Sequence, residues 1–118
     1  MAVARRVARD FNLDDDWLNT VVGAQWDTGL PTDIEGDTLW LRFGCLHIGV
    51  VGRAALIALK LIAAVDPSPS SVHTRDLIEL APSDAELDLA SEWVLGQDTS
   101  DTFPALLQQV VGHVREHR

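Results

Sequence analysis

The longest apolar stretch of the chain runs from Leu46 to Val65, and its pattern changes at Gly52. Residues 46–51 form a short, mainly apolar run that is typical of a strand, whereas residues 54–65 carry a single polar side chain, Lys60. A helix that is apolar on all sides lies inside a core. We therefore expect residues 54–65 to form the central helix, on which a charge needs a partner or a route to solvent.

Alternation of apolar and polar positions marks the segment just before this stretch, residues 38–43. With a Gly-Cys turn at 44–45, this strand and the strand 46–51 predict an antiparallel hairpin. A two-stranded sheet alone is only marginally stable, so the hairpin must lean on helices or on strands from elsewhere. The large residues on one face of the first strand are Leu39, Leu41 and Phe43.

Apolar positions spaced three and four residues apart predict helices on both sides of this unit. The clearest start signal is a capping box at Ser83 and Glu86. The predicted fold class is α+β, a single domain over residues 1–118 with a short antiparallel hairpin packed against about five to six helices. Besides the central helix, the predicted helices begin near residue 2, at Asp14, at Ser70 or Ser71, at Ser83, and at Thr102 or Asp101. Their apolar stripes include Ala4, Ala8 and Phe11 in the first helix and Leu106 in the last.

The chain is acidic, with a formal charge of −9 and a pI near 4.6. This balance argues against nucleic acid and against an anionic membrane surface as partners. The single cysteine excludes an internal disulfide, and the apolar helix is shorter than the roughly 20 residues that span a bilayer. With no apolar signal-peptide run at the N-terminus, we expect a cytoplasmic protein.

Three side-chain groups have the spacing of a chemical site, although each has a simpler interpretation. His113 and His117 have zinc-compatible spacing, but a solvated last helical turn explains them equally, and no metal site is predicted. Cys45 and His47 could form a nucleophile and base, but a lone hairpin cysteine is usually a small apolar residue. The acidic run 14–16 could hold a cation, and helix capping already accounts for it.

Lys60 is the only lysine, and His73 and Asp76 lie on the leucine-bearing face of the helix that follows. A Lys60–Asp76 pair would satisfy both charges, as a half-buried ion pair tying two helices, or Lys60 could reach water. The functional alternative is a cation placed to meet a phosphate with an acid beside it. The physics alone favours the structural interpretation.

An ordered series of short motifs runs through nearly the whole chain. It consists of Asp16-Trp17-Leu18-Asn19, Leu59-Lys60-Leu61, Ala63-Ala64, His73, Asp76-Leu77, Leu80, Ala81-Pro82-Ser83, Glu86-Leu87, Trp93 and Gln97-Asp98. This series resembles the downstream part of bacterial nucleotidyltransferase-like proteins, among them AbiEii-type abortive-infection toxins. The resemblance implies the back half of a nucleotidyltransferase fold, with catalytic or nucleotide-handling roles for Lys60 and Asp76.

The chain departs from that family at the metal site. The family holds two Mg²⁺ ions with a Gly-Ser turn and an acid-x-acid strand, and this sequence contains no Gly-Ser pair. We therefore expect no cofactor in this chain, and Mg²⁺ with a nucleoside triphosphate only where a catalytic half is supplied. Cofactor-binding residues stay unassigned.

The resemblance and the departure together predict a non-catalytic nucleotidyltransferase-like domain that acts through protein association, in a toxin–antitoxin setting. A truncated sheet exposes an edge and apolar surface, which favours a homo-oligomer such as a dimer, or another protein partner. The alternative is an active nucleotidyltransferase that modifies RNA or protein, with its metal-binding half upstream or on another chain. Whether the chain is itself an enzyme is left open.

Overall fold

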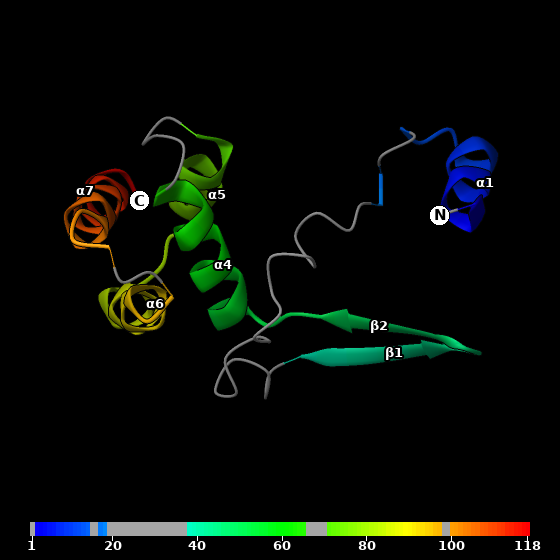
Figure 1. Cartoon of the computed structure of the whole chain (residues 1–118), viewed down its shortest axis with the longest axis horizontal. Helices are drawn as coiled ribbons and strands as arrows, with labels where there is room; N and C mark the ends of the chain where they lie inside the picture. The colour runs from blue at the N-terminus through cyan, green and yellow to red at the C-terminus, as the bar shows by residue number, and fades with distance from the viewer. Residues whose placement is uncertain (1, 15–16, 19–37, 66–70, 98–99) are drawn as a thin grey trace.

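The computed structural model describes residues 2–14, 17–18, 38–65, 71–97 and 100–118 (Figure 1). Within these residues it contains five helices and one two-stranded antiparallel sheet, which confirms the α+β fold class. Most of the helix predicted from Asp14 onward lies outside the described residues. The elements are α1 (Ala2–Phe11), β1 (Leu39–Phe43), β2 (Leu46–Val50), α4 (Arg53–Val65), α5 (Val72–Leu80), α6 (Asp84–Leu95) and α7 (Phe103–His117).

The core lies among α4, α5, α6 and α7, and α4 packs against each of the other three. Its Ile57 and Leu61 side chains are fully buried, as expected for the predicted central helix. The other three helices each turn one apolar stripe toward α4, which leaves their polar faces in solvent. The fully buried leucines on those stripes are Leu77, Leu87 and Leu107.

Local capping fixes where the core helices begin. The predicted capping box is present, because the Ser83 amide donates to Glu86 Oε2 at 2.8 Å and the Glu86 amide donates to Ser83 Oγ at 3.2 Å. Ser71 caps α5 in the same manner by accepting from the Thr74 amide. Thr102 stands at the N-terminal cap position of α7, one of the two predicted positions, but its backbone is helical and its side chain makes no capping hydrogen bond.

Helix α1 lies at the opposite end of the molecule from α7 (Figure 1). Ala4 and Ala8 are buried on its predicted apolar face, and the Trp17 indole Nε1 donates to the Ala4 carbonyl at 2.9 Å. Phe11, predicted on the same face, is 72% exposed. The chain is correspondingly extended, with a radius of gyration of 16.1 Å, against about 13.5 Å for a compact chain of this length.

The hairpin leaves the helical core at the start of α4 and projects away from α5–α7 (Figure 1). Val51, between β2 and α4, is half-buried and packs against the core. Gly52 then accepts the first hydrogen bond of the helix, from the Leu56 amide at 3.0 Å. The predicted strand–turn–helix unit is therefore confirmed, with its helical part inside the core and its sheet part outside it.

Candidate functional site

The two residues singled out for catalysis by resemblance contact one another across α4 and α5. Lys60 Nζ lies 2.6 Å from Asp76 Oδ2, and the two side chains are 29% and 37% exposed. The hydrogen bond from Lys60 lowers the pKa of Asp76, while partial desolvation opposes that change. The predicted ion pair is thus present, and the catalytic role of either residue stays a prediction.

His73 adds a third ionisable group to this pair. It lies one helical turn before Asp76, and its charge contributes to lowering the pKa of that carboxyl. Its Nδ1 atom is buried without a hydrogen-bond partner in the described part of the chain. Since Asp76 lies beside the Lys60 ammonium and offsets its charge, a phosphate that approached Lys60 would be repelled by that carboxylate.

The other candidate groups lie in different elements of the structure, and residues 15–16 of the acidic run lie outside the described residues. Cys45 lies exposed in the hairpin turn, and His47 is opposite Arg42 in the strand register. His113 and His117 stack at 4.2 Å between ring centroids, and the His117 ring nitrogen lies 2.8 Å from the His113 carbonyl oxygen. Among the described residues, no three His, Cys, Asp or Glu side chains gather as metal ligands.

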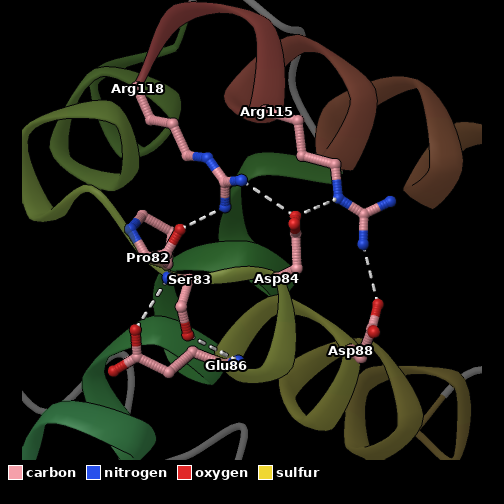
Figure 2. Close-up of polar contacts among 7 residues, drawn as sticks. All are labelled: Pro82, Ser83, Asp84, Glu86, Asp88, Arg115 and Arg118. Atoms are coloured by element: carbon pink, nitrogen blue, oxygen red, sulfur yellow. Dashed lines mark hydrogen bonds and ion pairs between the residues drawn. The ribbon is translucent and has the colours of Figure 1, made fainter.

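Figure 2 shows a polar contact that the sequence patterns did not indicate, between the last turn of α7 and the start of α6. Asp84 accepts from Arg118 at 2.9 Å and from Arg115 at 3.1 Å, and Asp88 accepts from Arg115 at 2.7 Å. Arg118 also donates to the Pro82 carbonyl. The sequence shows acids at the start of α6 and bases at the end of α7, where helix dipoles favour them. Which acid pairs with which base depends on how the two helices pack, and this could not be predicted from the sequence.

Arg53 makes a second contact of this kind, at the end of α4 that carries the hairpin. Its Nε donates to Glu86 Oε1 at 2.7 Å, and its Nη2 donates to the Leu80 carbonyl at 2.8 Å. The bond from Arg53, with that from the Ser83 amide, lowers the pKa of Glu86 to about 2. These contacts tie the first turn of α4 to the α5–α6 junction.

The most unusual surface of the described chain is one face of the hairpin, which we call the apolar hairpin face. All six of its side chains are large and apolar, and they are 38–62% exposed. They face one another in cross-strand pairs, so the surface is continuous across both strands. The pairs are Leu39 with Val50, Leu41 with Ile48, and Phe43 with Leu46.

The opposite face of the hairpin has a different character. Trp40 lies over Gly49, where an added Cβ would come within 3.0 Å of the indole ring. Arg42 and His47 complete this face with polar groups. The alternation in the sequence predicted the two faces, but nothing in the pattern showed that the apolar one would lie outside the core.

Comparisons with protein families, with characterised proteins and with solved structures found no match to this chain. The likeness to nucleotidyltransferase-like proteins therefore stays a prediction. In the described residues, no helix has the length and apolar character needed to cross a bilayer.

Proposed function

We propose that this chain functions as a protein-association module whose docking surface is the apolar hairpin face. The observation that carries the proposal is the exposure of six large apolar side chains on one side of a two-stranded sheet. Contiguous apolar surface of this kind marks interaction sites in folded proteins. A hairpin with no layer against it is also only marginally stable, so a partner that covers the face would stabilise the sheet.

The distribution of charge supports the same proposal. All 18 acidic residues lie outside residues 38–65, whereas Arg42, Arg53 and Lys60 lie inside that segment. The hairpin is therefore a part of this acidic protein that another acidic surface can approach with little repulsion. Protein interfaces share this depletion of charge at their centres.

Photo-crosslinking in the cells that make the protein tests this proposal. A benzoylphenylalanine at Phe43 lies on the apolar hairpin face, and the same residue at neighbouring Arg42 lies on the opposite face. We expect covalent protein adducts from position 43 and few from position 42. No adduct from position 43, or equal yields from both positions, would contradict an interface on this face.

The alternative function, nucleotidyl transfer, has one observation in its favour, the pairing of Lys60 with Asp76. If the chain is a nucleotidyltransferase, we expect binding heat on titration with Mg-ATP or Mg-CTP and transfer of labelled nucleotide to RNA or protein. Both signals should be lost in Lys60→Met. A chain that neither binds nucleotide nor labels a substrate leaves this alternative without support. The toxin–antitoxin setting also stays a prediction.

A further inference from the structure

We infer that the partner of the apolar hairpin face is a second copy of this chain, with two hairpins stacked face to face about a twofold axis. This inference rests on the proposed function and names the occupant of the same surface. Two stacked hairpins form a small two-layer sheet of four strands, which is the kind of support that an isolated hairpin lacks.

The arrangement of side chains on the apolar hairpin face suits contact between two copies of this face. Leu41 and Ile48 form the central cross-strand pair, and each flanking pair consists of two large apolar residues. A twofold axis through the central pair places apolar pairs opposite apolar pairs, without any charged side chain between the layers. The charged and polar residues Arg42 and His47 then remain on the outer faces.

The exposed area is adequate for a dimer of moderate affinity. The exposed fractions on the apolar hairpin face amount to about three whole large side chains, or roughly 500 Å². Covering that surface on both copies buries about 1,000 Å² in total, which is near the lower limit for a specific interface. We therefore expect a reversible dimer rather than a permanent one.

Charge favours a second copy over a partner chosen for its basic surface. A basic partner would be drawn to the remainder of the chain, which holds every acidic residue, and not to the acid-free segment 38–65. Two copies carry the same negative charge and repel through those acidic parts. Contact through the hairpins brings together the longest acid-free segments of the two molecules.

Sedimentation equilibrium over about 1–200 µM protein tests the inference directly. We expect the wild-type mass to rise with concentration from 12.9 kDa toward twice that value. Ile48→Asp places a charge in the centre of the face and is expected to weaken dimerisation by about 100-fold or more. His47→Asp is the matched control, because it adds the same charge at the adjacent position on the outer face and is expected to change the constant less than about threefold.

The single cysteine provides a second measurement. Cys45 lies in the turn at the tip of the hairpin, outside the apolar hairpin face, so a spin label there leaves the contact intact. We expect one defined intermolecular label-to-label distance in the wild type and none in Ile48→Asp. Circular dichroism of both Asp variants should match the wild type, since the helical core contains neither position.

The possible failures of the two proposals differ. A monomer at every concentration overturns the second-copy inference, and crosslinks from position 43 to a different protein would then still support the association module. A monomer with no crosslink, as when another part of this chain covers the face, overturns both proposals. A dimer that Ile48→Asp and His47→Asp weaken equally overturns the inference, because it must form through another surface.

Discussion

Substitution of Leu61 by alanine tests whether α4 is the centre of the fold. Leu61 is fully buried in the middle of α4, which packs against α5, α6 and α7. Several of its neighbours on the buried side of α4 are alanines, including Ala58 and Ala64. Small neighbours cannot extend into an emptied space, so the cavity left by the lost side chain should remain open.

The expected cost follows from two contributions. Leu61→Ala removes three carbon atoms from a site with no solvent exposure, which costs about 2.4 kcal/mol at about 0.8 kcal/mol per buried carbon. An uncollapsed cavity adds about 1 kcal/mol or more, giving a total of about 3–4 kcal/mol. For a urea m-value of about 1.5–2 kcal/mol/M, the unfolding midpoint falls by about 2 M.

Urea unfolding followed by circular dichroism measures this change, because most of the described residues are helical. The matched control is Leu89→Ala on α6, where the leucine is 53% exposed and its loss should cost less than about 0.5 kcal/mol. Equal losses for the two variants, or a loss below about 1 kcal/mol for Leu61→Ala, would refute the placement of α4 at the centre of the core.

Two further predictions concern the polar contacts around α4. Lys60→Met should lower the urea midpoint far less than Leu61→Ala, because both partners of the Lys60–Asp76 pair are partly exposed and water can solvate the freed carboxylate. A decrease as large as that of Leu61→Ala would mean that the pair is required for folding. Glu86→Gln should be less stable than the wild type near neutral pH, and the difference in stability should close as the pH falls from 4.5 to about 2. The reason is that a carboxyl whose pKa is lowered by folding contributes its stability above its unfolded pKa and loses it on protonation. A difference in stability that did not depend on pH in urea titrations would contradict this origin.

The elements that could be predicted from sequence are those whose signals are local. The capping box at Ser83, the hairpin turn and the almost wholly apolar helix each depend on neighbouring residues, and each is present in the structure. The Lys60–Asp76 pair was predicted for a related reason: two charges on core-facing stripes of consecutive helices have few other ways to be satisfied.

The features that could not be predicted from the sequence depend on how the helices and strands pack together. Periodicity placed Phe11 and Leu106 on core stripes, yet both are exposed, because a periodic stripe shows which residues share a face but not how wide the contact is. The pairing of Arg115 with Asp84 joins residues 31 positions apart and needs α6 and α7 to be side by side. The alternating strands likewise predicted an apolar face but not whether a layer would cover it.

The strand–turn–helix unit from Leu46 to Val65 joins the hairpin, which carries the proposed docking surface, to the helical core. Its helix is buried, and Arg53 in the first helical turn binds Glu86 and the Leu80 carbonyl, which fixes the start of α4 against two other helices. Its strand ends at Val50, and of the two residues that separate it from α4, Val51 packs on the core. A connection of two residues thus joins the apolar hairpin face to the helical core. This short connection limits the positions that the face can adopt, which lowers the entropy that a partner must remove on binding.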